Sequence, residues 1–320
     1  MKTRYLAALL STLLIAGCGG GGGSTNAGTS LAPAIPVATT SPPGPATVPM
    51  TISIPRTPPS ASARAARFFS PGTGSLAVYD GATLIYVANL SLDSSTQFAT
   101  VYAKSGSTTV APGTCSFTSS TATCTLTITS TVGAHKFDLV TYPGSQSSSG
   151  TGTPPAFTGV VASEGELSVT LSPGTNPGQT LTMLGVASNV IIAGAANGPY
   201  NQATQFGYRI QDSTNAQIVL PGAAYDNGPV TITAAPSGIV TIAPNSIATP
   251  PATAGDQNFN VTCVNASGGS VTISFNARTS PNTAYASGLT YSTSNYSAAV
   301  IATTTFSCDP SSATIPITVQ

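Results

Sequence analysis

The five cysteines are the residues whose type and spacing point most directly to chemistry. Cys18 follows an apolar N-terminal segment, whereas the other four form two local pairs, Cys115 with Cys124 and Cys263 with Cys308. In an oxidising compartment, paired thiols form disulfides. Local pairing is the simplest of the three connectivities, and loop-closure entropy predicts roughly 2.7 kcal/mol from the short loop and roughly 4 kcal/mol from the long one.

The sequence offers little for metal binding or nucleophilic catalysis. No Cys-x-x-Cys is present and His135, the only histidine, is not near a cysteine pair, so the pattern disfavours a zinc site. A serine hydrolase would need His135 as its base, but Asp138 would face the opposite side of a strand and no Gly-x-Ser-x-Gly elbow occurs. We therefore predict that His135 is a surface residue at a strand edge, with no catalytic residue, cofactor or metal.

Three acidic segments could act as ligands or as paired acids. Glu164 and Glu166 fall on one side of a predicted strand, where they could work as paired carboxylates. Asp212–Asn215 and Asp226–Gly228 could hold calcium in a loop, although neither has the EF-hand spacing. We predict solvated glutamates at a strand start and two ordinary turns.

Tyrosines are the remaining candidates for a binding surface. Tyr285, Tyr291 and Tyr296 cluster near the C-terminus, and exposed aromatic rings of this kind can contact sugars or proteins. Packing inside the fold is the favoured alternative, and the absence of tryptophan weakens the case for carbohydrate.

Short β-strands must position these residues. Apolar and polar residues alternate in Leu167–Leu171, Val230–Ala234 and Phe259–Cys263, which is the period of a strand with one buried face. Asp80-Gly81 lies between two such runs and predicts a tight hairpin. Turn signals every 8–12 residues and the lack of a fixed repeat favour antiparallel β-sandwiches over solenoids or propellers.

Composition narrows the possible partners. Charged residues make up 6% of the chain, about a quarter of the usual share, and no basic patch is visible, so nucleic acid is not an expected partner. After the apolar start, no run reaches the ~20 apolar residues that a membrane-spanning helix needs.

The N-terminus has the layout of a secretory signal, with Lys2 and Arg4 before an apolar run from Leu6 to Ile15. Leu14-Ile15-Ala16-Gly17-Cys18 resembles the lipobox of bacterial lipoproteins. This resemblance implies cleavage before Cys18, lipid on its thiol and a membrane anchor. By analogy with lipoprotein sorting, Gly19 after the cysteine favours the outer membrane or cell surface.

The mature chain as a whole resembles bacterial cell-surface lipoproteins that carry tandem immunoglobulin-like β-sandwich domains. The features that carry the resemblance are the lipobox, the Gly/Pro-rich stalk, the Thr-rich strands and the local cysteine pairs. Cys263 and Cys308 would take the place of the inter-sheet bridge of an immunoglobulin fold, but Phe306 stands where the tyrosine corner would be. The predicted division is a signal peptide (1–17), a lipidated, disordered stalk (18–48), domain 1 (49–143), a linker (144–156), domain 2 (157–249) and domain 3 (250–320). The sequence leaves open whether domain 3 folds alone or shares a core with domain 2.

The resemblance implies a non-catalytic role in adhesion, scaffolding or spacing at the cell envelope. The alternative is a ligand-binding module that contacts a polysaccharide or an envelope protein through loops or through the tyrosines.

Overall fold

The computed structural model describes residues 44–55, 70–90, 98–117, 121–148, 152–220, 222–281, 296 and 298–311. Cys18, the predicted signal and most of the stalk, Tyr285 and Tyr291 lie outside these ranges. The all-β prediction is confirmed, because the described residues form strands in mainly antiparallel sheets and no helix. None of them belongs to a helix that could cross a membrane.

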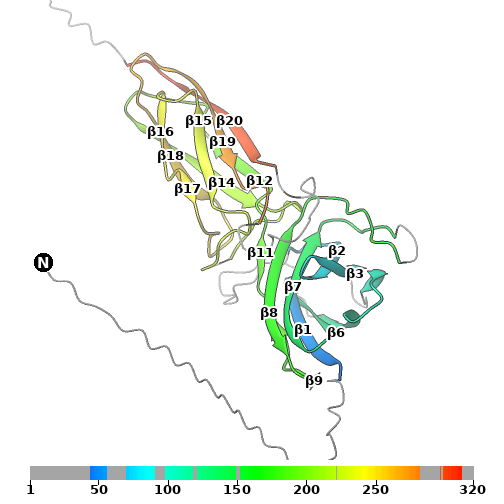
Figure 1. Cartoon of the computed structure of the whole chain (residues 1–320). Helices are drawn as coiled ribbons and strands as arrows, with labels where there is room; N and C mark the ends of the chain where they lie inside the picture. The colour runs from blue at the N-terminus through cyan, green and yellow to red at the C-terminus, as the bar shows by residue number, and fades with distance from the viewer. Residues whose placement is uncertain are drawn as a thin grey trace, which may run out of the picture. The chain divides into compact units, whose positions relative to one another are not determined.

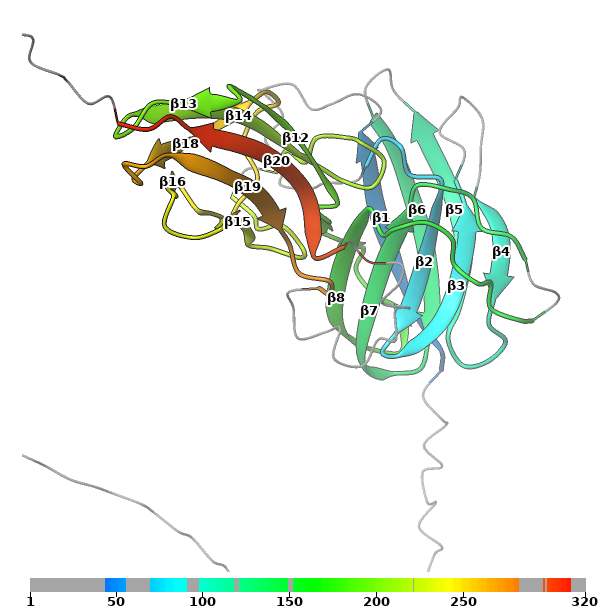
Figure 2. The ribbon, with the colours of Figure 1, turned by 90° about the horizontal axis from the view of Figure 1, so that it is seen from above.

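The first half of the described chain builds two facing sheets around one core (Figures 1 and 2). Figure 2 shows strands of sheet B side by side in front of those of sheet A. Their inner faces supply Val48, Leu126, Leu76 and Phe137 to the core. Sheet A contains β1 (Ala46–Pro55), β5 (Thr109–Phe117), β6 (Thr121–Ser130), β9 (Gly174–Thr175) and β10 (Gln179–Thr180); sheet B contains β2 (Ser75–Asp80), β3 (Thr83–Asn89), β4 (Ala99–Ala103), β7 (Gly133–Tyr142), β8 (Ser163–Leu171) and β11 (Met183–Gly185).

The second half builds another two sheets around an aromatic core. Phe206, Phe259, Phe275 and Phe306 are all buried there, and the ring centroids of Phe206 and Phe259 lie 5.1 Å apart. Sheet C contains β12 (Asn189–Gly194), β14 (Ala203–Gln211), β16 (Val240–Ala243) and β18 (Gln257–Cys263); sheet D contains β13 (Asn197–Gly198), β15 (Val230–Ala235), β17 (Ser246–Ile247), β19 (Gly269–Asn276) and β20 (Val300–Cys308).

Strand pairing differs from the predicted boundary at 144–156. β8 pairs with β7 from Gly133↔Leu171 to Thr141↔Ser163, so this segment joins two strands of sheet B and does not separate two domains. Gln146 explains the difference, because its buried side chain hydrogen-bonds Ser75 and accepts from the backbone N–H of Thr158. Gly/Ser/Pro composition alone does not distinguish such a packed connection from a free linker.

The predicted boundary between 249 and 250 also falls inside shared sheets. β14 pairs with β18 in sheet C, and β15 pairs with β19 in sheet D. Side chains from both segments form a single hydrophobic cluster. Residues after 250 therefore complete the core that begins at Ala187, which is the alternative that the sequence left open, whereas residues 163–185 belong to the first pair of sheets.

Candidate functional site

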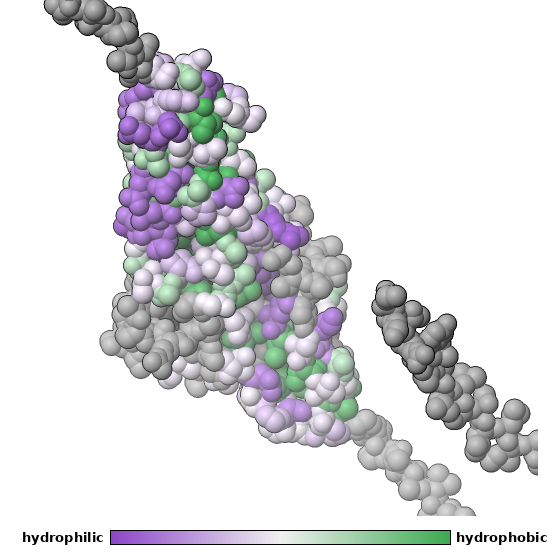
Figure 3. Space-filling model, turned by 90° about the vertical axis from the view of Figure 1, so that its left-hand side faces the viewer, coloured by the Kyte–Doolittle hydropathy of each residue, from purple (hydrophilic) through white to green (hydrophobic). Residues whose placement is uncertain are grey.

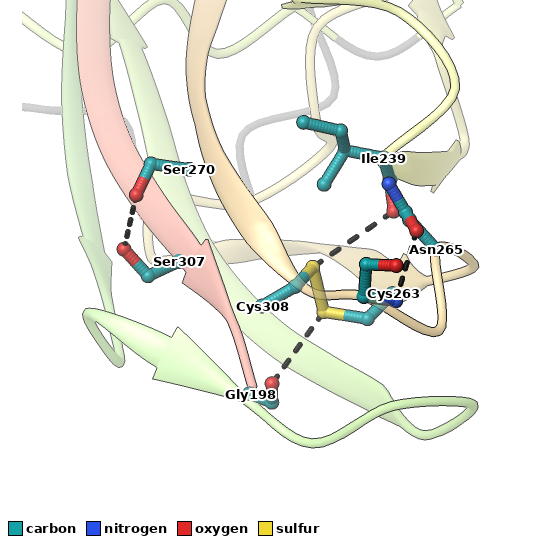
Figure 4. Close-up of a disulfide and its surroundings, with 8 residues drawn as sticks. Gly198, Ile239, Cys263, Asn265, Ser270, Ser307 and Cys308 are labelled. Atoms are coloured by element: carbon teal, nitrogen blue, oxygen red, sulfur yellow. Dashed lines mark hydrogen bonds between the residues drawn. A yellow bond between two sulfur atoms is a disulfide. The ribbon is translucent and has the colours of Figure 1, made fainter. Parts of the chain in front are cut away.

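A disulfide joins the two sheets of the second core (Figure 4). Cys263 on β18 and Cys308 on β20 have Cα atoms 5.6 Å apart, and both side chains are buried. The Cys263 sulfur lies 3.5 Å from the carbonyl oxygen of Gly198. The predicted pairing and its inward-facing position between sheets are both confirmed.

The other disulfide lies within one sheet. Cys115 on β5 and Cys124 on β6 occupy directly opposite positions, with Cα atoms 4.1 Å apart. Both bridges match the local pairing predicted from spacing. Disulfides persist in oxidising compartments, so the two bridges indicate an extracellular or surface protein.

His135 is not the surface residue that the sequence predicts. Its side chain on β7 is 11% exposed, and its Nδ1 lies 3.0 Å from Oδ2 of Asp80 at the end of β2. Its Nε2 lies 2.9 Å from the carbonyl oxygen of Thr131. The register places Asp80 opposite Phe137, so the hairpin of β2 and β3 brings a carboxylate to the histidine from 55 residues away.

Ser130 lies beside this pair but is not arranged as a nucleophile. Its Oγ is 3.4 Å from both ring nitrogens of His135, beside the ring and not in line with one nitrogen. Nδ1 faces the Asp80 carboxylate and Nε2 faces the Thr131 carbonyl oxygen, so neither nitrogen is directed at the Ser130 hydroxyl. Ser130 instead shares a 2.8 Å hydrogen bond with Thr108, whose hydroxyl donates to Oδ2 of Asp80. This network fixes the carboxylate and does not resemble a working triad.

The fixed carboxylate lines a polar pocket at the ends of the strands. The pocket has a volume of about 270 Å³ and lies between the β2–β3 hairpin and the β4–β5 loop. Asp80 supplies a negative charge, Lys104 a positive charge, and hydroxyl groups complete the lining. This arrangement suits a small, hydroxylated and charged ligand. The lining residues are Asp80, Thr83, Ile85, Lys104, Gly106, Ser107 and Thr108.

A second polar site contains buried carboxyl groups. Glu164 on β8 is 1% exposed and Asp226, in the loop before β15, is 2% exposed. Together with Glu166 they line a cavity of about 170 Å³. Burial is the largest cause that raises the pKa of Asp226 to about 7, and the charges of Asp138 and Glu166 raise it further. The hydrogen bond with Glu164 lowers this pKa in part. The prediction of a solvated Glu164 is therefore wrong. Within the described ranges, no three metal-ligating side chains are placed to hold an ion.

Tyr296 is part of this buried site and does not belong to an exposed surface. Its side chain is 4% exposed, and its hydroxyl donates to Oδ2 of Asp226. The predicted tyrosine binding surface is therefore wrong at this position, because the ring packs in a cluster with Val186 and Tyr142.

The Asp212 segment is the ordinary turn that the sequence predicts. Oδ1 of Asp212 accepts from the backbone N–H groups of Thr214 and Ala216, as in an Asx turn. Burial raises the pKa of Asp212, and four hydrogen bonds to its carboxylate oppose that shift.

Exposed apolar side chains are scattered over the described surface. On the face drawn in Figure 3, hydrophobic areas are small and lie between hydrophilic ones. The largest exposed apolar side chains come from different segments of the chain. They are Val132, Ile191, Tyr200, Val264 and Val300.

Comparisons with known proteins add a distant structural similarity. No family model and no curated protein matches the sequence. A solved structure, the Yersinia pseudotuberculosis adhesin InvE, is similar over 82% of this chain with 15% identity and a TM-score of 0.27. The aligned region spans 58% of that adhesin. At this TM-score the similarity carries no argument about function.

Proposed function

We propose that this chain is a non-catalytic, lipid-anchored protein of the bacterial envelope that acts as an adhesion, scaffold or spacer module. The observation that carries the proposal is the pair of disulfides within Thr- and Ser-rich sheets, because such bridges belong to proteins that work outside the cytoplasm. The arrangement of His135 supports a non-catalytic role, since both of its nitrogens face acceptors. The proposal of a lipid anchor is supported by the sequence up to Cys18.

Removal of the lipid anchor should abolish attachment to the membrane and leave the folded part of the protein unchanged. We expect the full chain, expressed in a bacterium that processes lipoproteins, to partition into detergent and to increase retention of cells on a polysaccharide or host-cell surface. Cys18→Ala should move the protein to the aqueous phase and abolish the gain in retention, because the thiol is the site of lipid attachment. Gly20→Ala is the matched control.

Two results would contradict this proposal. One is equal retention with and without Cys18. The other is hydrolysis of model esters or glycosides that disappears in His135→Gln, which would mean that the histidine acts in catalysis.

A second candidate function is ligand binding in the polar pocket, now centred on loops and not on tyrosines. The specific observation is that Thr108 and His135 hold Asp80 in place beside Lys104 at a pocket of about 270 Å³. A fixed carboxylate, an ammonium group and several hydroxyls together recognise polyhydroxylated ligands that carry an acidic group.

Lys104 provides the test of that candidate. We expect an oligosaccharide of uronic acids to bind with millimolar affinity by isothermal titration calorimetry, and Lys104→Gln to weaken binding at least tenfold by removing the cation. Lys136→Gln, at an exposed lysine outside the pocket lining, should bind as the wild type does. Equal weakening in both variants would assign the effect to net charge and reject the pocket.

A further inference from the structure

The two ring nitrogens of His135 both face oxygen atoms that accept hydrogen bonds. Nδ1 lies 3.0 Å from Oδ2 and 3.2 Å from Oδ1 of Asp80, and Nε2 lies 2.9 Å from the carbonyl oxygen of Thr131. A neutral imidazole has one N–H, so its other nitrogen would turn a lone pair toward one of these oxygens. The imidazolium ion has two N–H groups and can donate to both partners. The geometry therefore favours the charged form of the ring.

The Asp80 carboxylate is placed to hold this positive charge. Its Oδ2 also accepts from the Thr108 hydroxyl over 3.0 Å. The side chain of Asp80 is 18% exposed and that of His135 is 11% exposed. Charges in such partly buried positions are screened by solvent and salt much less than charges on an open surface. The pair thus joins the end of β2 to β7 through an ion pair that persists at ordinary salt concentrations.

The charged groups around His135 come from few elements. Lys104, in the loop between β4 and β5, lines the same polar pocket as Asp80. Lys136 is exposed and follows His135 on β7, so its side chain points to the opposite face of the sheet. On β8, Val169 lies opposite His135. The strands of the facing sheet A contain no acidic or basic residue. Asp80 and Lys104 are therefore the charged groups that act on the ring most directly.

We propose that the proton on His135 sets the charge of the polar pocket, so that an acidic ligand binds more tightly when the ring is protonated. This inference rests on the ligand-binding candidate proposed above for the same pocket. With the imidazolium present, the positive charges of His135 and Lys104 outweigh the negative charge of Asp80, and the pocket attracts an anionic group. Without the proton, Lys104 and Asp80 balance each other, and one ring nitrogen no longer donates to its oxygen partner.

The direction of the pH dependence follows from linkage between the ligand and the proton. A ligand that binds the protonated protein more tightly must increase the affinity for the proton by the same factor. Histidine side chains change charge between about pH 5 and about pH 8. Carboxyl groups of ordinary acidity stay ionised over most of this range, so the charge of a uronic acid changes little. The affinity should therefore be highest at the acidic end and fall as the ring loses its proton.

Ring protonation and ligand binding can be followed on the same protein, because His135 is the only histidine in the chain. Nitrogen NMR of the ligand-free full chain reports the ring, and isothermal titration calorimetry reports binding of an oligosaccharide of uronic acids. We expect both ring nitrogens to carry a proton at about pH 5.5, and the affinity to be about fivefold weaker at about pH 8. The two changes should share one midpoint. In His135→Gln the affinity should not change with pH.

Asp226→Asn is the matched control, because burial is the largest cause that raises the pKa of Asp226 to about 7 and this group could add a pH dependence of its own. Asp226 lines the other cavity, so its replacement should leave the pH dependence of binding unchanged. If His135→Gln does not fold, the comparison of the two midpoints in the wild type still decides.

The possible failures of this experiment are distinguishable. No binding at either pH would reject the ligand candidate and, with it, the regulation of that site. Equally strong binding at both pH values, or different midpoints for the ring and the affinity, would overturn the proton dependence alone. A ring with a single N–H at about pH 5.5 would overturn it as well.

Discussion

Replacement of Cys263 and Cys308 together by alanine is expected to lower the free energy of unfolding by about 4 kcal/mol. The bridge closes a loop across a sequence separation of 45 residues, so its removal releases a large conformational freedom in the unfolded chain. It also joins sheet C to sheet D, and no backbone pairing replaces that link between β18 and β20. Urea denaturation of the purified mature chain measures the loss.

The Cys115–Cys124 bridge is the internal comparison for this experiment. Its sequence separation is 9 and its strands are already paired, so the double alanine variant should lose less, about 2.7 kcal/mol. A smaller loss from the long loop than from the short one would contradict the loop-entropy explanation. Mass spectrometry of the folded protein confirms the bridges before the measurement.

Phe275→Ala is expected to cost about 3–5 kcal/mol, because it opens a cavity in the aromatic core of the second pair of sheets. The ring is fully buried on β19 and packs edge-on against Phe259, with centroids 5.5 Å apart. It also contacts the ring of Tyr208 on β14, with centroids 5.8 Å apart. Both the residues before 250 and those after it should therefore lose protection from hydrogen exchange.

Ile191→Ala is the control for that variant, since its side chain is 47% exposed on β12 and its loss should cost well under 1 kcal/mol. If Phe275→Ala exposed only residues 250–311 and left β14 and β15 protected, the two segments would be independently folded. That result would restore the separate third domain expected from the sequence.

Alternation along the strands predicted much of this core. Phe259, Val261 and Cys263 were expected to face inward together, and all three are buried. The period-two rule succeeds here because each strand has one face on the opposite sheet. The period-two rule did not predict β5, because Pro112 and Gly113 within it are residues typical of a loop. In the structure the pairing of β5 with β6 is irregular at this point, and an alanine Cβ at Gly113 would collide with the Thr125 backbone.

The candidate sites were predicted less well because the surroundings of each residue depend on residues that are far away in the sequence. His135 is a surface residue in the prediction from sequence, whereas in the structure Asp80, 55 positions earlier, lies beside it. Tyr296 is an exposed aromatic residue in the prediction from sequence, whereas in the structure its hydroxyl contacts Asp226, 70 positions away. Glu164 belongs to an alternating strand whose outer face would ordinarily be wet, but it is 1% exposed and lines a cavity together with Asp226 and Leu184. Local patterns contain no information on such contacts, whereas cysteine spacing gave the disulfides directly.

The position of β1 determines how the fold responds to mechanical tension. A force applied to the chain before Ala46 is transmitted to the fold through β1. This strand pairs antiparallel with β6 from Ala46↔Ser130 to Pro55↔Thr121. β9 and β10 pair with it in parallel on the other side, so the strand is held along both edges. Backbone hydrogen bonds lie across the strand, and a force along its axis therefore loads them in shear. Many bonds must break together before β1 slides out, whereas a strand peeled from one end loses them one at a time.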